Sequence, residues 1–372
     1  MIRPMTVLLA SGASGGHLFP ALAVAEVLRK RGVRCVIVLG GDAFADKVMQ
    51  AGFELLSLPA SPFNVRNPFR KLMAIFRFIW GFGIALKFVW RETPAVVLGT
   101  GGYASVATLF AAKVIGTPTL VHEQNVLPGR ANKLLSRIVD TVLLTFEESR
   151  EYVPASVDVK VVGTPLRETV CEAAAAMTAP PQDDLFGLLV LGGSKGSGVI
   201  SEVVSEMVAS MTPREREEVR LVHQCRPSEV NRLQALYERL GVGEVTVQSF
   251  FDDLPRYYEK THVVIGRSGT GTLMETSLFG RAAIYAPHQL ADGHQRLNAE
   301  VAEHIGAAIV MDAPVFTPKN LLVQVRSLMA DPLKVRAMGV AAKNLASPDA
   351  AIRVAEALLS AADKDILQDT QL

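Results

Sequence analysis

Short apolar runs that end in glycine-rich loops recur through this 372-residue sequence and constrain its fold more than any other feature. In the first half, Thr6–Ala10 and Ala95–Leu98 end in such loops, and in the second half Leu188–Leu191 and Val263–Ile265 do the same. Strands of this kind that alternate with helices form a parallel sheet covered on both faces, with ligands at the carboxyl ends of the strands. The sequence therefore predicts an α/β architecture in two copies.

A hinge-like segment separates the two copies. Gly163–Arg167 reads Gly-Thr-Pro-Leu-Arg, and a spacer rich in alanine and proline follows at Ala173–Pro181. We therefore expect an N-terminal domain over residues 1–163 and a C-terminal domain over residues 164–344. The polar tail after the last helices is expected to fray.

Charge and cysteine content exclude several classes of protein. The formal net charge is +1, which argues against a nucleic-acid partner. The three cysteines are far apart, with no C-x-x-C spacing, so the sequence indicates a reducing compartment rather than a disulfide framework. The first apolar segment is too short for a signal peptide and reads as a strand.

The stretch Val263–Glu275 has the pattern of an anion pocket. Its strand breaks at Gly266, continues through small residues to Thr272, and opens a helix that carries Glu275. Glycines let the backbone approach a ligand, and the N–H groups at a helix start face negative charge. A carboxylate one turn inside the helix suits a sugar hydroxyl, so the pattern indicates a nucleotide with phosphates and a ribose. A plain tight turn has the same pattern.

The first glycine loop, Ser11–His17, carries a candidate base. Its glycines do not have the G-x-G-x-x-G spacing, and it lacks a Walker A lysine. His17 closes the loop after the first strand, where an imidazole can take a proton from an attacking hydroxyl near neutral pH. The alternatives are that His17 caps the next helix or binds phosphate. Asp42, after the second strand, keeps an NAD-type oxidoreductase open.

A polar cluster follows another apolar strand at His122–Asn125, which reads His-Glu-Gln-Asn. Polar residues at such a place need partners or a ligand. A metal site needs further ligands at suitable spacing, and the sequence offers no second cluster. We therefore expect no metal and no other cofactor.

The stretch Phe63–Arg91 is apolar and basic, without a single Asp or Glu. Its longest uncharged run, Phe78–Leu86, is far shorter than the ~20 residues of a spanning helix. A basic helix rich in aromatics is typical of one that lies in an anionic membrane surface, although a core helix with a basic edge has the same composition. The residues expected to meet the membrane are Arg70, Phe76, Arg77, Ile79, Trp80 and Phe82.

Taken together, the loops resemble the MurG family of peptidoglycan N-acetylglucosaminyltransferases over most of the chain. The motifs that carry the resemblance, in order, are the glycine loop with His17, G-T-G-G-Y-A-S at Gly99–Ser105, H-E-Q-N at His122–Asn125, G-T-P-L-R at Gly163–Arg167, G-G-S-K-G-S from Gly192, F-F-D-D-L at Phe250–Leu254, R-S-G-T-G-T-L-M-E ending at Glu275, and D-G-H-Q-R-L-N-A at Asp292–Ala299. In the first loop, Ser14 stands where the family usually has threonine.

The resemblance implies a GT-B fold, in which two Rossmann-like parallel-sheet domains face each other across a cleft and the last helix, at about 345–362, returns to the N-terminal domain. It implies inverting transfer of N-acetylglucosamine from UDP-N-acetylglucosamine to the C4 hydroxyl of lipid I, the undecaprenyl-pyrophosphoryl-MurNAc-pentapeptide. The product is lipid II, so the enzyme would serve cell-wall growth, cell shape and cell division. It would act at the cytoplasmic face of the plasma membrane as a peripheral protein, with other cell-wall synthesis enzymes as further partners.

The resemblance also implies roles for individual residues. His17 would be the catalytic residue. The acceptor side would comprise Ser14, Gly15, Gly16, Tyr103, Glu123 and Asn125. The donor side would comprise Arg167, Ser194, Phe251, Thr270, Gly271, Thr272, Leu273, Met274, Glu275, His294 and Gln295.

Two further functions remain open beside the transferase and the oxidoreductase. A UDP-N-acetylglucosamine 2-epimerase shares the two-domain fold and needs no lipid acceptor. A nucleotide-sensing membrane adaptor would bind UDP and vesicles without catalysis.

Overall fold

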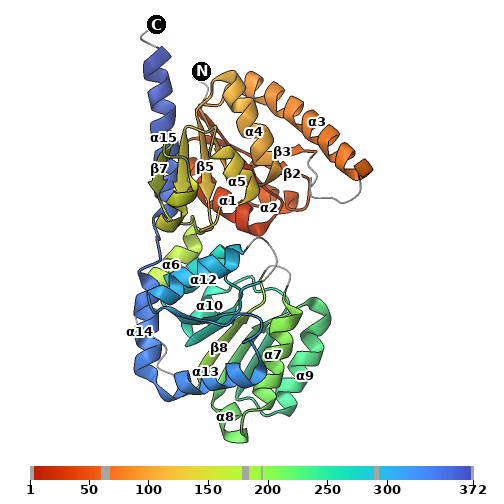
Figure 1. Ribbon diagram of the computed structural model, residues 1–372, viewed down its shortest axis with the longest axis vertical. Helices are drawn as coiled ribbons and strands as arrows, with labels where there is room; N and C mark the ends of the chain where they lie inside the picture. Colours follow the sequence, from red (N-terminus) through yellow and green to blue (C-terminus); the bar gives the residue numbers. More distant parts are fainter. Residues whose placement is uncertain (1–3, 60–67, 178–183, 194–195, 289–292, 370–372) are drawn as a thin grey trace. The chain divides into compact units, whose positions relative to one another are not determined.

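The computed structural model describes residues 4–59, 68–177, 184–193, 196–288 and 293–369. Its chain divides into two compact units, Met1–Arg167 with Ser347–Leu372, and Glu168–Ala346 (Figure 1). The sequence placed the boundary at residues 163–164, whereas the structural boundary follows Arg167, the last residue of the hinge-like segment. Each unit contains one parallel sheet covered by helices, as the alternating pattern predicts.

The N-terminal unit is built on a seven-stranded parallel sheet with the order β3-β2-β1-β4-β5-β6-β7. Its strands are β1 (Thr6–Ser11), β2 (Arg34–Gly40), β3 (Glu54–Leu58), β4 (Val96–Gly99), β5 (Thr119–Glu123), β6 (Thr141–Leu144) and β7 (Asp158–Val161). Every residue of β1 and β4 is buried, so these central strands read as continuous apolar runs. The strand order reverses between β1 and β4, and at such a switch point the loops at the carboxyl ends leave room for a ligand.

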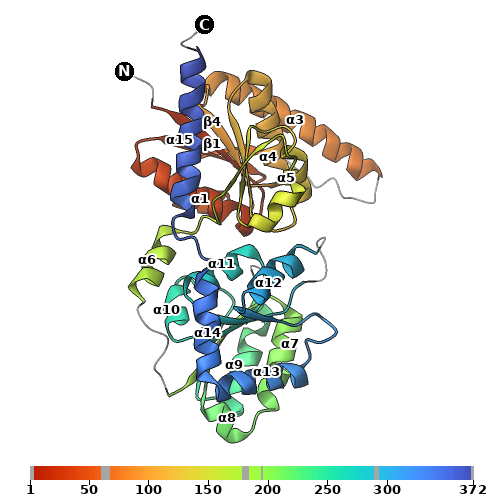
Figure 2. The same cartoon turned by 60° about the vertical axis from the view of Figure 1, so that its left-hand side comes forward.

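Helices cover both faces of this sheet. They are α1 (Gly15–Lys30), α2 (Ala45–Gln50), α3 (Pro68–Glu92), α4 (Gly102–Ile115), α5 (Arg130–Leu135) and the C-terminal α15 (Ala350–Asp369), with a short 3-10 turn η1 (Glu147–Tyr152). Helix α15 runs alongside α1 (Figure 2), and it buries Val354 and Leu358 in the core with α1 residues such as Leu28. The last helix is therefore part of the N-terminal unit, although it starts at Ala350 rather than near residue 345.

The C-terminal unit has a six-stranded parallel sheet with the order β10-β9-β8-β11-β12-β13. The strands are β8 (Phe186–Leu191), β9 (Val219–Gln224), β10 (Glu244–Gln248), β11 (Val263–Gly266), β12 (Ala282–Tyr285) and β13 (Ala308–Val310). The remaining elements are α6 (Glu168–Ala176), α7 (Gly198–Ala209), α8 (Pro213–Glu217), η2 (Pro227–Glu229), α9 (Val230–Arg239), α10 (Pro255–Glu259), α11 (Thr270–Leu278), α12 (His294–His304), α13 (Pro318–Ala330) and α14 (Pro332–Lys343). Here the strand order reverses between β8 and β11, so the loops after these two strands flank the switch point.

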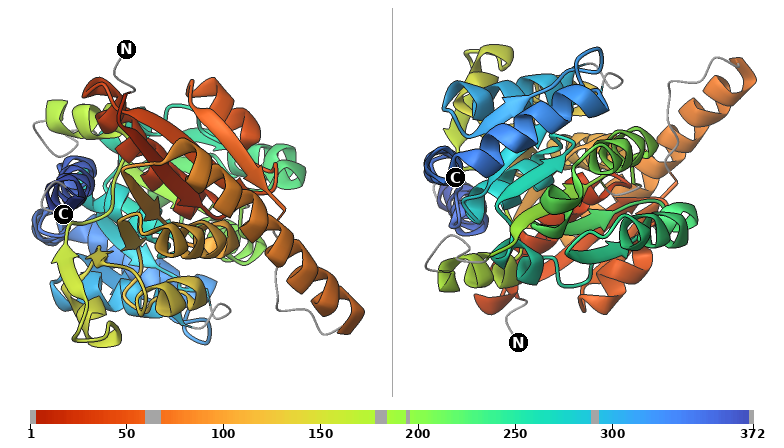
Figure 3. Two further views of the ribbon diagram at one scale, coloured as in Figure 1. Left: turned by 90° about the horizontal axis from the view of Figure 1, so that it is seen from above. Right: turned by 90° about the horizontal axis from the view of Figure 1, so that it is seen from below.

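Helix α3 differs from the others because its first half carries many exposed apolar side chains, although Ala74 within it is buried. Ala85 and Val89 are buried in the core of the N-terminal unit, where α3 lies against α4. The first half extends away from the sheet (Figure 3) and carries exposed apolar side chains at helical spacing of three or four residues. These side chains are Phe69, Leu72, Met73, Phe76, Ile79 and Trp80, which we call the apolar stripe.

The length of α3 corrects one expectation. Its segment Leu72–Glu92 contains an 18-residue window with a mean hydropathy of 1.8 and is long and apolar enough to cross a membrane, whereas the uncharged run in the sequence predicted that it is too short. Length alone does not decide the matter, because Ala85 and Val89 would have to leave the core of the unit for the helix to span a bilayer. Phe82 is half-buried and packs against this core, and the side chain of Arg70 lies outside the described residues.

Candidate active site

The N-terminal unit places His17 at its switch point. Strand β1 ends at Ser11, Ser14 precedes α1 as its N-cap residue, and His17 lies in the first turn of that helix. The hydroxyl oxygen of Ser14 is 3.0 Å from Nδ1 of His17. The other ring nitrogen, Nε2, makes no hydrogen bond to any residue that the structure describes. Burial lowers the pKa of His17 below its usual value, so the neutral imidazole prevails at neutral pH.

Two glycine loops enclose the His17 ring. A Cβ atom added to Gly12 would lie 2.8 Å from Nδ1 of His17, and one added to Gly101 would lie 2.9 Å from Nε2. Gly101 also has a φ of 117°, a conformation that glycine alone adopts readily. The close approach brings the loop after β1 against the loop after β4, so the imidazole position depends on both loops. The sequence predicts only that Gly12 and Gly101 belong to loops. The structure adds that both lie against the His17 ring.

The His-Glu-Gln-Asn cluster is mostly an internal network. Glu123 is buried, and its carboxylate accepts hydrogen bonds from the Asn125 N–H at 2.8 Å and from the Gly129 N–H at 3.0 Å. The side-chain amides of Asn125 and Asn132 donate to it as well, at 3.1 and 2.8 Å. Desolvation nevertheless raises the pKa of Glu123 above its usual value. Glu123 thus holds the 125–132 loop in place, and Asn125 is the half-buried end of the cluster.

The neighbours of Glu123 anchor the cluster to the sheet. The imidazole Nε2 of His122 lies 2.8 Å from the Gly163 carbonyl oxygen, and Gln124 Nε2 donates to the Thr100 carbonyl oxygen at 2.9 Å. Burial lowers the pKa of His122 to about 4, so this histidine is neutral. The loops after β4, β5 and β7 are thereby joined.

The other expected acceptor-side residues lie at the carboxyl ends of β1 and β4 as well. Gly15 and Gly16 open α1 next to Ser14, and Tyr103 is half-buried in the first turn of α4. The structure therefore brings Ser14, His17 and the glycines together at one switch point.

The C-terminal unit places the start of α11 at its own switch point. The helix begins at Thr270, two residues earlier than the sequence indicated, and its N-cap residue Gly269 offers no side-chain cap. The first-turn amides of an uncapped helix suit an anion. Gly271 is exposed, and Thr272 and Glu275 are half-buried. The side chains of Leu273 and Met274 are buried in the unit, so these two residues can meet a ligand only through the backbone.

Arg267, to which sequence reasoning gave no role, ties three loops of this site together. Its guanidinium donates to the Ser197 hydroxyl at 3.0 Å and to the carbonyl oxygens of Ala286 at 2.6 Å and Pro287 at 3.2 Å. Ser197 caps α7 after the loop that follows β8. A polar residue directly after a buried strand was the available signal, but nothing in the sequence shows which loops such a residue reaches.

Buried polar residues join α12 to the loop between β11 and α11. The Ser268 hydroxyl donates to the Gln295 carbonyl oxygen at 2.7 Å, and Asn298 Nδ2 lies 3.3 Å from both the Ser268 carbonyl oxygen and the Thr270 hydroxyl. The Gln295 side-chain oxygen accepts the His288 N–H at 2.9 Å. The start of α12 is therefore fixed beside the start of α11.

The remaining donor-side expectations fall at several places. His294 is the first residue of α12, and Phe251 is buried with its ring 4.7 Å from that of Tyr257. Arg167 is exposed at the end of the N-terminal unit, with its guanidinium 5.9 Å from the ring centre of Phe19. Ser194 lies outside the described residues.

The described part of the chain contains no group of three or more His, Cys, Asp or Glu side chains that could hold a metal ion. In one unit the described side chains offer the neutral imidazole of His17. In the other unit they offer the start of α11, which has no side-chain cap and lies beside the hydrogen bonds of Arg267, Ser268 and Asn298.

Comparison with known proteins identifies the family to which both units belong. The pattern of the Glycosyltransferase family 28 N-terminal domain matches residues 7–144, and that of the Glycosyltransferase family 28 C-terminal domain matches residues 187–354. A UDP-N-acetylglucosamine–N-acetylmuramyl-(pentapeptide) pyrophosphoryl-undecaprenol N-acetylglucosamine transferase from Methylobacterium radiotolerans is 36% identical over 362 residues, which is 96% of this chain and 98% of that protein. A transferase of the same name from Geobacter metallireducens is 33% identical over 97% of this chain and 100% of that protein.

Solved structures agree with the sequence comparison. The crystal structure of MurG from Acinetobacter baumannii superposes with a TM-score of 0.77 at 26% identity, over 96% of this chain and 100% of that one. A UDP-GlcNAc 2-epimerase from Neisseria meningitidis bound to UDP-GlcNAc gives a TM-score of 0.67 at 16% identity, over 96% of this chain and 100% of that one, and shares the fold alone. The GT-B fold expected from the sequence is confirmed. With full-length relatives above 30% identity, this chain belongs to the MurG family of UDP-N-acetylglucosamine-dependent glycosyltransferases.

Proposed function

We propose that this chain transfers N-acetylglucosamine from UDP-N-acetylglucosamine to the C4 hydroxyl of lipid I and forms lipid II for peptidoglycan synthesis. The observation that carries the proposal is the 36% identity, over 96% of the chain, with a transferase named for this reaction. The epimerase alternative rests on a fold likeness at 16% identity and has no such support.

In this proposal, His17 is the general base. With Nδ1 3.0 Å from the Ser14 hydroxyl oxygen, the tautomer that donates Nδ1–H to Ser14 leaves the Nε2 lone pair open. The acceptor hydroxyl attacks the anomeric carbon, its proton passes to Nε2, and the bond from that carbon to the UDP oxygen breaks with inversion. A lowered pKa keeps His17 neutral and ready to accept a proton at neutral pH.

The leaving UDP gains negative charge, and we assign its stabilisation to the start of α11. In this assignment the amides from Thr270 to Thr272 meet the diphosphate, and the family pattern adds Arg167 and Ser194 as further donors. One preorganised donor to developing charge is worth roughly 3 kcal/mol, or about a hundredfold in rate. Glu275, half-buried one turn into the helix, is assigned to the ribose hydroxyls. Backbone groups and cationic side chains supply this stabilisation, so we propose that the reaction needs no metal.

The remaining assignments follow the family pattern. The main chain of Phe251 would meet uracil, and His294 and Gln295 the donor sugar. Ser14, Gly15, Gly16, Tyr103 and Asn125 would form the acceptor side, with Glu123 positioning Asn125 through two hydrogen bonds.

Membrane contact is assigned to the apolar stripe of α3. Phe76 is 61% exposed and Trp80 59% exposed, and Arg77 lies between them in the sequence. An exposed apolar face next to basic residues binds an anionic membrane surface. We therefore propose a peripheral enzyme at the cytoplasmic face of the plasma membrane, where it meets its lipid-linked acceptor and other cell-wall synthesis enzymes.

The test is an incubation with radiolabelled UDP-N-acetylglucosamine, with and without a lipid I analogue, in the presence of EDTA. The proposal requires labelled lipid II and released UDP only when the acceptor is present. An epimerase would convert the nucleotide sugar unaided, and an adaptor would release no UDP in either case. Loss of transfer in EDTA would overturn the metal-independent mechanism.

A further inference from the structure

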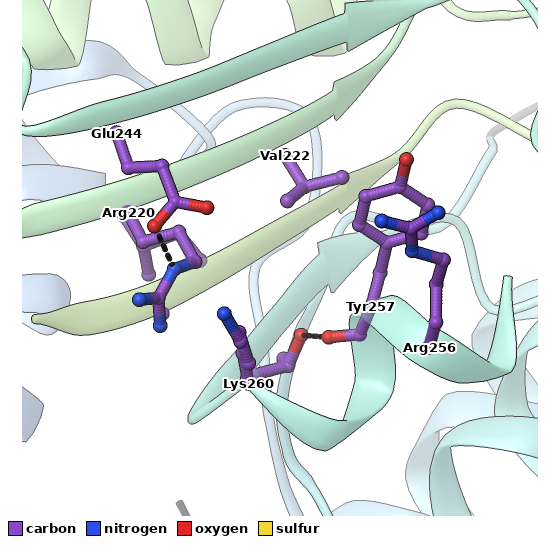
Figure 4. A pocket seen from close by; sticks show the side chains of 9 residues that line it. Arg220, Val222, Glu244, Arg256, Tyr257 and Lys260 are labelled. Carbon is purple, nitrogen blue, oxygen red and sulfur yellow. Dashed lines mark hydrogen bonds and ion pairs between the residues drawn. The ribbon is translucent and has the colours of Figure 1, made fainter. Parts of the chain in front are cut away.

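A small cationic cavity lies between α10 and the strands β8, β9 and β10 (Figure 4). It has a volume of about 80 Å³. Its lining comprises Gly187, Leu188, Arg220, Val222, Glu244, Arg256, Tyr257, Lys260 and Thr261. Gly187, Arg220 and Glu244 stand at the amino ends of their strands, so the cavity lies at the opposite end of the sheet from the start of α11.

A buried guanidinium forms the floor of this cavity. The side chain of Arg220 is 7% exposed, and its Nε donates to a Glu244 carboxylate oxygen at 2.6 Å. Taking a cation out of water is costly unless nearby negative charge compensates it. Glu244 supplies one negative charge and is itself 47% exposed.

Two further cations line the same space. Arg256 and Lys260 are exposed on α10 and just after it, and neither forms an ion pair with any described residue. The Arg256 guanidinium lies 5.3 Å from the ring centre of Tyr257, which holds it against the cavity wall. In Figure 4 the Lys260 ammonium points toward the Arg220–Glu244 pair. With three cations and one carboxylate, the lining carries an excess of two positive charges.

We propose that this cavity binds a tetrahedral dianion, either free phosphate or the phosphate group of a monoester. At about 30 Å³ per water, the cavity has room for two or three water molecules, which is the size of one small oxyanion. A dianion also matches the excess charge. Arg220 would provide a rigid donor fork, and Lys260 a mobile point charge above it.

The experiment is a phosphate titration followed by thermal unfolding, with saturating UDP present to occupy the site at α11 and potassium chloride as the ionic-strength control. Phosphate should raise the melting temperature, and chloride at the same ionic strength should not. Lys260→Gln and Arg256→Gln should each weaken phosphate binding about tenfold, since each removes one charged partner. Lys334→Gln, an exposed lysine of α14 in the same unit, should leave it unchanged.

Both lining variants change exposed side chains, so their melting temperatures without phosphate should equal that of the wild type. Arg267→Lys separates this site from the donor site: it should weaken UDP binding and leave phosphate binding intact. A parallel titration with glycerol 3-phosphate tells the two sources apart, because protection by phosphate alone means the free ion and protection by both means a monoester. Equal phosphate affinity in the wild type and in both lining variants, or equal protection by chloride, would overturn the proposal.

Discussion

The Ser14 hydroxyl oxygen lies 3.0 Å from Nδ1 of His17, and a Cβ atom on Gly12 would lie 2.8 Å from the same nitrogen. Nδ1 therefore has the Ser14 hydroxyl as its hydrogen-bonding partner and the backbone of Gly12 close beside it. This arrangement fixes the ring and leaves Nε2 as the atom that can accept a proton.

Gly12→Ala should displace the His17 ring. The new methyl group would meet Nδ1 and also the Gly102 backbone at 3.2 Å, so the ring must move. A misplacement of about 1 Å in a catalytic group can cost about a hundredfold in rate. We expect kcat with a soluble lipid I analogue to fall by about that factor while UDP affinity stays within about threefold. Gly83→Ala, in α3 with no described atom near the added Cβ, is the matched control and should keep its kcat.

Arg267→Lys should weaken donor binding. A lysine cannot reach the Ser197 hydroxyl and the Ala286 carbonyl oxygen together, so a buried acceptor loses its partner at a cost of about 1–3 kcal/mol. Calorimetry should show UDP affinity reduced about tenfold. Arg326→Lys, at an exposed ion pair with Glu215 in the same unit, should leave the affinity within error. Equal UDP affinity in both variants would show that the loops hold their places without Arg267.

How much of this site can be read from the sequence depends on what each residue touches. His17 and the start of α11 follow from a strand, a glycine loop and a helix, all of which are local in the chain. Arg267 donates hydrogen bonds to Ser197 and Ala286, which are distant in sequence, so no local pattern reveals its role. The resemblance assigns Glu123 to the acceptor side; in the structure its carboxylate accepts four hydrogen bonds, from Asn125, Gly129 and Asn132.

The strands also differ in how well their own sequence predicts them. Buried central strands such as β1 and β11 are continuous apolar runs and were predicted. Strands β3 and β7 lie at the edges of their sheet, and β7 (Asp158–Val161) is mostly exposed. Such strands lack a continuous apolar run and were missed, because partners across the sheet rather than their own sequence define them.

Replacement of the apolar stripe should release the protein from membranes. Phe76→Ser together with Trp80→Ser removes two large exposed side chains, each worth about 1.5–3 kcal/mol when fully buried in an apolar phase. Binding to vesicles that contain anionic lipid should weaken at least about tenfold in a sedimentation assay. Leu333→Ser, at a 79% exposed leucine of α14, is the control and should bind as the wild type does. Unchanged binding of the double variant would assign membrane contact to another surface.

Acid should destabilise the protein through two buried histidines. Burial lowers the pKa values of His122 and His223 to about 4, so the folded state keeps both neutral while the unfolded chain takes up protons below its pKa of about 6.5. Stability is therefore fully present above pH 6.5 and falls as the pH drops toward 4, by up to about 1.4 kcal/mol per pH unit for each histidine.

Urea unfolding of the full chain between pH 7 and pH 5 measures this loss of stability. His223→Gln keeps a polar group near the Tyr237 hydroxyl and the Ser201 hydroxyl but does not ionise, so it should flatten the slope. His304→Gln changes an exposed histidine of α12 and should retain the wild-type slope. A slope unchanged by His223→Gln would place the acid sensitivity elsewhere.

The most direct test of the central claim measures His17→Ala for two quantities at once: kcat for transfer of N-acetylglucosamine to a lipid I analogue, and the dissociation constant of UDP. Our account predicts that kcat falls by at least about a hundredfold, as expected for the loss of a general base, while UDP binding changes little. A near-normal kcat in His17→Ala would contradict the account.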